Sequence, residues 1–221
     1  MASARNGLAR VLESEGDYAG AEREFSQALD VANRTVGIEC YVGAQILLNH
    51  SILEFDRGCY TDSEREARQA LEALRKLGGE DTPYVASALV QLGEDRVFQG
   101  DVNSAIPMLR EAVDTRRRHY LSAHPGVVAA EVRLAEALTA HGDWRESEKI
   151  LRGAMDDIRS AAFKLAPWRV AEAESALGMC LAAQGQTAQA RRLLESSQSA
   201  LASAPHPVFR KLAAARLRQL R

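Results

Sequence analysis

The chain has 221 residues, of which 46% are hydrophobic, 26% charged and 5% aromatic, so enough apolar surface exists for a core and wholesale disorder is excluded. Its 28 basic against 30 acidic residues give a net charge of −2, which argues against a dedicated nucleic-acid-binding protein. No apolar run approaches the roughly 20 residues that span a bilayer, and no signal segment opens the chain, so we expect a cytoplasmic protein without membrane contact.

A glycine recurs at a nearly constant interval along the whole chain. Gly16, Gly58, Gly100 and Gly142 lie 42 residues apart, and Gly185 follows after 43. Small residues recur seven positions before each glycine, at Ala9, Ser51, Gly93, Ala135 and Gly178. Such self-similarity is typical of stacked helical repeats, in which small residues let helix axes approach closely. The pattern predicts two helices per repeat, A before the glycine and B after it.

The predicted helices follow in chain order. Helix A is expected over 2–15, 41–57, 83–99, 125–141 and 168–184, and helix B over 18–33, 60–76, 102–118, 144–160 and 187–202. A last helix over 207–220 has an apolar stripe and a basic side that includes Arg216 and Arg218. We expect it to cap the stack, with its basic side in water.

The predicted fold class is therefore all-α: a right-handed superhelical solenoid of five helix-turn-helix repeats plus a C-terminal capping helix. We expect one domain, 1–221, whose units cover about 2–40, 41–82, 83–124, 125–166 and 167–205, followed by the cap at 206–221. The residue after the turn glycine is expected to cap helix B at Asp17, Asp101 and Asp143. Large side chains such as Leu8 and Trp144 are expected to fill the gaps between helices.

Motifs for chemistry are missing from the sequence. It holds no phosphate-binding loop, nucleophile elbow or dinucleotide fingerprint, and its histidines fall at unrelated repeat positions. Three widely spaced cysteines favour neither a disulfide framework nor a zinc site. We therefore expect a protein that is not an enzyme and that uses no cofactor or metal. The basic run 116–119 is interpreted as a solvated helix end, and Cys59 as an exposed, inert thiol.

The turn glycine, the aromatic residue that follows it in several units and the small residues at fixed offsets resemble tetratricopeptide repeats. The 42-residue period and the linkers HPGV and HPVF are similar to the longer variant found in kinesin light chains and many bacterial proteins. The stretch WRVAEAESALGMCLAAQGQTAQARRLLESS also resembles the last repeat after the kinase domain of bacterial serine/threonine kinases.

The resemblance implies that the A helices line a concave groove that binds a peptide or protein segment. The partner-binding residues that it implies are Asn6, Arg10, Leu48, Asn49, Ile52, Phe55, Gln91, Glu94, Val97, Phe98, Arg133, Glu136 and Met179. Apolar anchors beside amides suit such a segment. Alternatively, Phe55 and Phe98 pack between neighbouring A helices, an interpretation that the sequence leaves open. No lysine accompanies Asn6 and Asn49, which departs from the carboxylate clamp of chaperone-binding relatives.

Three functional interpretations follow. The first is a non-catalytic scaffold for a protein or peptide ligand. The second is a self-association module, or a regulatory and sensor region of a larger bacterial signalling protein such as a serine/threonine kinase. The third, an enzyme on a helical scaffold, has no motif in its favour.

Overall fold

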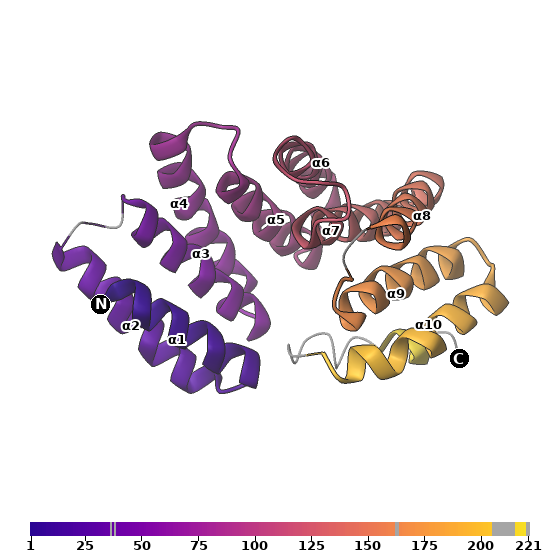
Figure 1. Ribbon diagram of the computed structural model, residues 1–221, viewed down its shortest axis with the longest axis horizontal. Helices are drawn as coiled ribbons and strands as arrows, with labels where there is room; N and C mark the ends of the chain where they lie inside the picture. Colours follow the sequence, from indigo (N-terminus) through magenta and orange to yellow (C-terminus); the bar gives the residue numbers. More distant parts are fainter. Residues whose placement is uncertain (36, 38, 162–163, 205–214, 220–221) are drawn as a thin grey trace. The chain divides into compact units, whose positions relative to one another are not determined.

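The computed structural model describes residues 1–35, 37, 39–161, 164–204 and 215–219. These residues form helices joined by short connections, and no strand occurs among them (Figure 1). In the same part of the chain, no helix combines the length and the apolar character needed to cross a membrane.

The helices are, in chain order, α1 (Ala2–Glu15), α2 (Tyr18–Thr35), α3 (Tyr41–Asp56), α4 (Tyr60–Gly78), α5 (Pro83–Phe98), α6 (Val102–His119), α7 (Pro125–His141), α8 (Trp144–Ser160), α9 (Pro167–Ala183) and α10 (Thr187–Ala202). Each of them agrees with its predicted range to within two residues at either end. Most of the predicted last helix, at 206–214 and 220–221, lies outside the described residues, whereas residues 215–219 are helical.

The chain groups into two compact units, Met1–Thr115 and Arg116–Arg221, which we call the N-terminal and the C-terminal unit. The expectation of a single continuous solenoid over 1–221, with the repeat bounds given above, stays a prediction.

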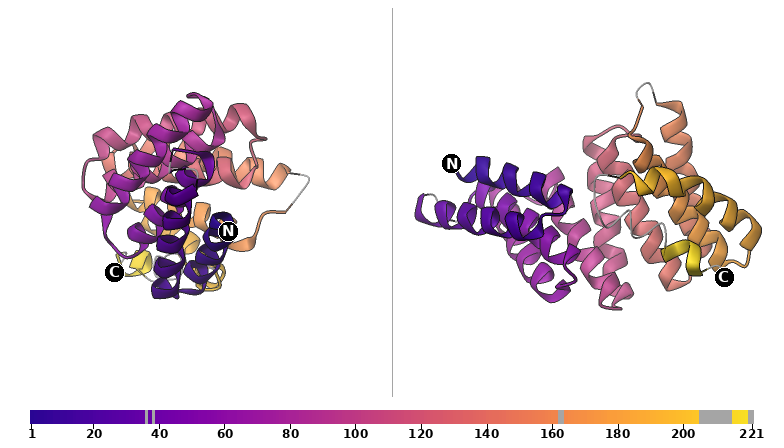
Figure 2. Two further views of the ribbon diagram at one scale, coloured as in Figure 1. Left: turned by 90° about the vertical axis from the view of Figure 1, so that its left-hand side faces the viewer. Right: turned by 90° about the horizontal axis from the view of Figure 1, so that it is seen from below.

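Within each unit the odd-numbered helices correspond to helix A and the even-numbered helices to helix B. Each A helix packs against the B helix that follows it, as α1 does with α2, α3 with α4, α7 with α8 and α9 with α10 (Figures 1 and 2). Neighbouring A helices also touch, as α1 with α3, α3 with α5 and α7 with α9. This is the packing of stacked helix-turn-helix repeats, in which each repeat buries its apolar face on the next.

The small residues lie where helices A and B cross, as predicted. A Cβ atom on Gly93 of α5 would lie 2.5 Å from the Leu109 side chain of α6, and one on Gly178 of α9 would lie 2.9 Å from Leu194 of α10. In each of these two helix pairs, a leucine of helix B thus fills the space that a side chain at the glycine of helix A would occupy. The five turn glycines have φ between 78° and 102°, the left-handed region that ends helix A.

Two of the three predicted caps are confirmed. The Asp17 carboxylate accepts from the backbone N–H of Gly20 at 2.9 Å, and the Asp101 carboxylate accepts from that of Ser104 at 3.3 Å. The prediction for Asp143 is wrong, because its side chain makes no cap hydrogen bond and instead pairs with the ring of His141 at 2.8 Å.

The predicted burial of Leu8 and Trp144 is also wrong, since both side chains are exposed. Leu8 lies on α1, which packs against α2 on one side and α3 on another. No helix of the described N-terminal unit covers the remaining side of α1, so Leu8 stays exposed there although it belongs to the periodic apolar pattern.

Candidate partner-binding surfaces

Two asparagines on neighbouring A helices meet in the N-terminal unit. The Asn49 side-chain NH2 of α3 donates to the Asn6 side-chain oxygen of α1 at 3.0 Å, and both residues are half-buried. A side-chain amide has two N–H donors and a two-lone-pair acceptor, so one mutual bond leaves further hydrogen-bonding capacity in the pair. The structure therefore brings two of the predicted binding residues together as a preformed amide pair.

Three aromatic rings lie together where α3 and α5 end and α4 begins. The Phe55 ring at the end of α3 contacts the Phe98 ring at the end of α5 edge to face, with centroids 4.9 Å apart. Tyr60, at the start of α4, lies 5.3 Å from Phe55 and 5.1 Å from Phe98. We call Phe55, Tyr60 and Phe98 the aromatic cluster. Its rings pack on one another across helices, and Phe98 is nevertheless 56% exposed.

Two predicted binding residues of this unit are buried and do not reach its surface. Leu48 belongs to the core formed by α3, α4, α5 and part of α6. The Gln91 side chain is also buried, and its NH2 donates to the Ser63 hydroxyl at 3.2 Å and to the Asp95 carboxylate at 3.3 Å. Both expectations are corrected, because these positions of helix A face the helices packed beside it.

The other predicted residues of the N-terminal unit keep some exposure. Arg10 on α1 is exposed, while Ile52 on α3 and Glu94 and Val97 on α5 are half-buried. Together with the amide pair and the aromatic cluster they form what we call the N-terminal A face.

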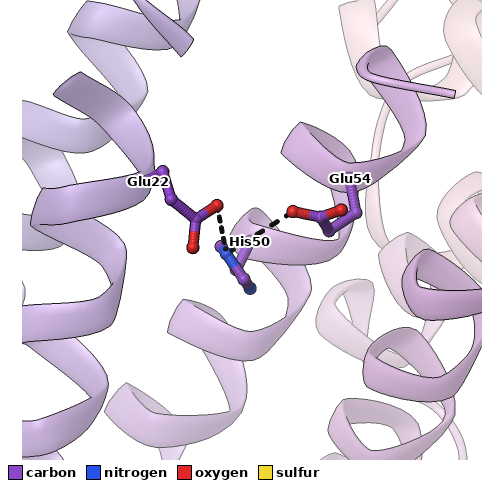
Figure 3. Close-up of side chains that lie close together, drawn as sticks. All are labelled: Glu22, His50 and Glu54. Atoms are coloured by element: carbon purple, nitrogen blue, oxygen red, sulfur yellow. Dashed lines mark hydrogen bonds and ion pairs between the residues drawn. The ribbon is translucent and has the colours of Figure 1, made fainter. Parts of the chain in front are cut away.

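His50 is the centre of a buried charge cluster to which the sequence analysis assigned no role (Figure 3). Its Nδ1 lies 2.7 Å from the Glu66 carboxylate of α4, and its Nε2 lies 3.1 Å from the Glu22 carboxylate of α2. Glu54, one helical turn after His50, is 3.9 Å from the same Nε2. In the sequence, only the i, i+4 spacing of His50 and Glu54 indicates that these two side chains lie close together. That spacing does not predict the contacts of His50 with the B helices α2 and α4.

Glu22, His50 and Glu54 present ligand atoms that lie within 4.8 Å of one another, a grouping in which a divalent cation can be held. The Arg57 guanidinium, however, donates to the Glu22 carboxylate at 2.9 Å and to the Glu54 carboxylate at 2.7 Å. The same oxygens thus already face two positive groups, Arg57 and the imidazolium. The arrangement acts as an ion-pair network that ties α3 to α2 and α4.

The cluster shifts several pKa values. Burial disfavours the charged form of His50, but the hydrogen bonds and charges of Glu66 and Glu22 outweigh it and raise the pKa of His50 to about 9. Burial also opposes ionisation of Glu22, yet His50 and Arg57 hold the pKa of that carboxyl below its ordinary value. Desolvation raises the pKa of Glu13 and of Asp95, each to about 7.

In the C-terminal unit, the predicted residues Arg133 and Glu136 take part in a network between α7 and α9. The Arg133 guanidinium donates to the Glu136 carboxylate at 2.6 Å and also to the Glu172 carboxylate of α9. Arg169 donates to the second oxygen of Glu172 at 2.9 Å. Met179, the last predicted residue, is half-buried on α9.

A residue far along the chain completes this network. The Arg216 guanidinium donates to the Ser175 hydroxyl of α9 at 2.9 Å and to the Glu136 carboxylate of α7. Arg216 is only 8% exposed, so its expected place on a solvated basic side is wrong. Burial would raise the pKa of Glu136, but the charges of Arg133 and Arg216 hold it below its ordinary value. We call Glu136 and Ser175 the arginine site.

The basic run at the end of α6 is used in packing. The guanidinium of Arg117 donates to the buried Glu131 carboxylate of α7 at 2.7 Å and 3.0 Å, and Arg116 donates to the Gly126 carbonyl. The interpretation as a solvated helix end is therefore corrected for the half-buried Arg116, whereas Arg117 pairs with Glu131 and keeps 52% of its side chain exposed.

A shallow hollow of about 360 Å³ lies on the other side of the C-terminal unit, between α8, α9 and α10. Two of its three arginines, Arg152 and Arg159, pair with Glu148 at 2.8 Å and with Asp156 at 3.0 Å. The third, Arg192 on α10, is exposed. Most of the positive charge at the hollow is therefore already paired.

Stacked antiparallel helix pairs define a helical-repeat protein that serves as a protein-interaction scaffold. Two family models, both described as tetratricopeptide repeat, match residues 1–39 and 42–118, together more than half of the chain. The chain belongs to the tetratricopeptide-repeat family. The search of curated proteins found no match.

Solved structures show the same fold at low sequence identity. A putative kinesin light chain of Podosopora anserina with nearly identical repeats is 19% identical with a TM-score of 0.72, covering 90% of this chain and 94% of that one. A Rap protein complexed with competence and sporulation factor is 16% identical with a TM-score of 0.67, covering 99% and 63%. YrrB, described as having an unusual peptide-binding site, is 16% identical with a TM-score of 0.51, covering 96% and 89%.

Proposed function

We propose that this chain binds an extended peptide or protein segment on the N-terminal A face, as a non-catalytic scaffold in the cytoplasm of a bacterium. The observation that carries the proposal is the aromatic cluster, which has its Phe98 ring exposed and shares helix α3 with the amide pair. YrrB, with its peptide-binding site, supports this kind of ligand for the fold.

The spacing on α3 suits an extended ligand. Asn49, Ile52 and Phe55 follow one another at three-residue intervals and so share one side of the helix. At 1.5 Å of rise per residue, the amide and the ring are about 9 Å apart along the axis, roughly the length of three extended residues. An apolar ligand side chain would pack on the rings while the ligand backbone hydrogen-bonds to the amides.

The three cysteines are all unpaired, which suits a reducing compartment. A regulatory role in a larger bacterial signalling protein is supported by the sequence resemblance alone.

Binding of a segment on this face is tested with a library of displayed peptides selected against the full chain. The selected peptide is then titrated against Phe98→Ala and, as a matched control, against Leu77→Ala, an exposed apolar residue on the B helix α4. Because exposed aromatics dominate such interfaces, we expect Phe98→Ala to raise Kd about tenfold or more and Leu77→Ala to leave it unchanged. Equal affinities for both variants and the native chain would overturn the proposal.

Self-association is a second candidate, which the exposed Leu8 and Val11 on α1 favour. They lie three residues apart and so form a small apolar patch on one side of that helix. If the patch mediates a dimer, light scattering will show a mass that rises with concentration for the native chain and stays monomeric for Leu8→Glu. A native chain that stays monomeric throughout would exclude this candidate.

A further inference from the structure

Arg216 lies where a ligand of the C-terminal unit is expected. The sequence resemblance implied Glu136 as a partner-binding residue of helix A, and its carboxylate accepts a hydrogen bond from the chain's own Arg216. The second guanidinium nitrogen is bound by Ser175, on the neighbouring A helix. One planar side chain thus bridges α7 and α9 from the side that this fold presents to partners.

The position of Arg216 does not match a helix that simply extends the stack. Such a helix would take the next A position and contact α9 and α10, because each repeat touches only its neighbours. Glu136 lies on α7, a full repeat earlier and 80 residues away in sequence. The helical residues 215–219 therefore reach back across the A helices, through a buried arginine.

We propose that the arginine site recognises an arginine of a basic peptide segment, and that the chain's own Arg216 fills the site until such a partner displaces it. The inference deepens the proposed function and rests on it, because it assigns a partner class to a second A face. The partner is a segment of another protein that carries an arginine flanked by small or apolar residues, as Arg216 is by Ala215 and Leu217.

The chemistry of the site selects arginine over lysine. Two acceptors on two helices are met by two nitrogens of one rigid, planar group, whereas the single ammonium of lysine is a point donor. Exchange is also feasible electrostatically. When Arg216 leaves, the Glu136 carboxylate keeps its 2.6 Å hydrogen bond from Arg133, so the buried charge is not stranded while a partner replaces the guanidinium.

The test uses the full chain and a fluorescein-labelled peptide of residues 211–221, KLAAARLRQLR, added in trans. Fluorescence anisotropy gives the peptide Kd for the native chain, for Arg216→Ala and for the control Arg218→Ala, whose side chain is exposed two residues further on. An intramolecular competitor lowers the apparent affinity by the fraction of open sites, so Arg216→Ala should bind at least about tenfold more tightly than the other two.

A second peptide, with lysine in place of the arginine at 216, should bind Arg216→Ala about tenfold more weakly than the first. Adding Glu136→Gln to Arg216→Ala should abolish the gain, with circular dichroism confirming that the helices are intact. Equal binding to the native chain and Arg216→Ala, no binding to Arg216→Ala, or equal binding of both peptides would each overturn the proposal. Peptides whose binding depends on Phe98 bind the N-terminal A face alone. Failure of the 211–221 peptide experiment would therefore overturn the arginine-site proposal, while the Phe98→Ala titration would still test the proposed function.

Discussion

The proton on the His50 imidazole links the stability of the N-terminal unit to pH. The pKa of His50 is raised from its ordinary 6.5 to about 9 in the folded chain by its carboxylate partners. A pKa raised by folding stabilises the fold fully below pH 6.5 and loses this effect as pH rises through 9. Burial raises the pKa values of Glu13 and Asp95 to about 7, so these two groups also lower the free energy of unfolding as pH rises, between about pH 4 and 7.

We therefore predict that the free energy of unfolding falls as pH rises from 6.5 to 9, by on the order of 2 kcal/mol. Urea denaturation at a series of pH values measures it. His50→Gln should flatten the dependence in this window and leave the fall between about pH 4 and 7 in place. A native profile that is level from 6.5 to 9 would show that the cluster does not hold the proton.

The close contact between Gly93 and Leu109 gives a second residue-scale prediction. A methyl group at Gly93 would lie 2.5 Å from the leucine side chain, so Gly93→Ala should destabilise the fold by about 1–3 kcal/mol. Gly153, inside α8, has nothing within 4 Å of the same position and is exposed. Gly153→Ala should instead stabilise by about 0.5–1 kcal/mol, because alanine is the better helix former. Denaturant midpoints of both variants measure the two changes in unfolding free energy. Changes of the same sign in the two variants would contradict the prediction.

At the scale of helices, start and stop signals explain how much the sequence could predict. Glycine at positive φ and proline at the first helical position act locally, so the bounds of all ten named helices followed from spacing alone. Burial depends on which helix lies beside which. Leu48 and Gln91 occupy positions of helix A that the family resemblance implies for the groove, yet neighbouring helices cover them.

The His50 cluster and the contact of Arg216 with the arginine site escaped sequence analysis for the same reason. The cluster draws its members from three helices, and Arg216 is 80 residues away from Glu136 in sequence. No periodic pattern encodes such a meeting, since charged residues on a helix usually face water. The sequence left open whether Phe55 and Phe98 bind a partner or pack between helices, and the structure shows the two rings packed on each other with Phe98 exposed.

The two kinds of helix start permit a matched test. Asp17 accepts a hydrogen bond from the N–H of Gly20, whereas Asp143 makes no such bond at the start of α8. Asp17→Ala should therefore cost about 1 kcal/mol of unfolding free energy and Asp143→Ala measurably less. Thermal unfolding of the two variants compares them directly, and an equal loss would mean that the Asp143 side chain also caps its helix.

Over the whole molecule, the reactivity of the three thiols measures how well the packed helices exclude a reagent from the core. Cys180 on α9 is fully buried in the core of the C-terminal unit, whereas Cys40 and Cys59 are half-buried near helix starts. The hydrogen bond to Glu54 raises the pKa of the Cys59 thiol, which fits the expected inert cysteine.

With a disulfide reagent at neutral pH, we expect Cys40 to react first and Cys59 more slowly, because its raised pKa leaves less thiolate. Cys180 should react only after local unfolding of α9 against α10. Urea should accelerate that third, slow phase, and Cys180→Ser should remove it. Three equal rates in the native chain would mean that the α9–α10 core opens freely.

The proton held by His50 has a calorimetric consequence. At pH 8 the folded imidazole is charged and the unfolded one is neutral, so each molecule that unfolds hands about one proton to the buffer. The heat of that transfer adds to the heat of unfolding. The apparent enthalpy should therefore differ between Tris, which binds protons exothermically, and phosphate, and the difference should vanish in His50→Gln. The unfolding enthalpy of this chain is therefore obtained only after the heat of buffer protonation has been subtracted.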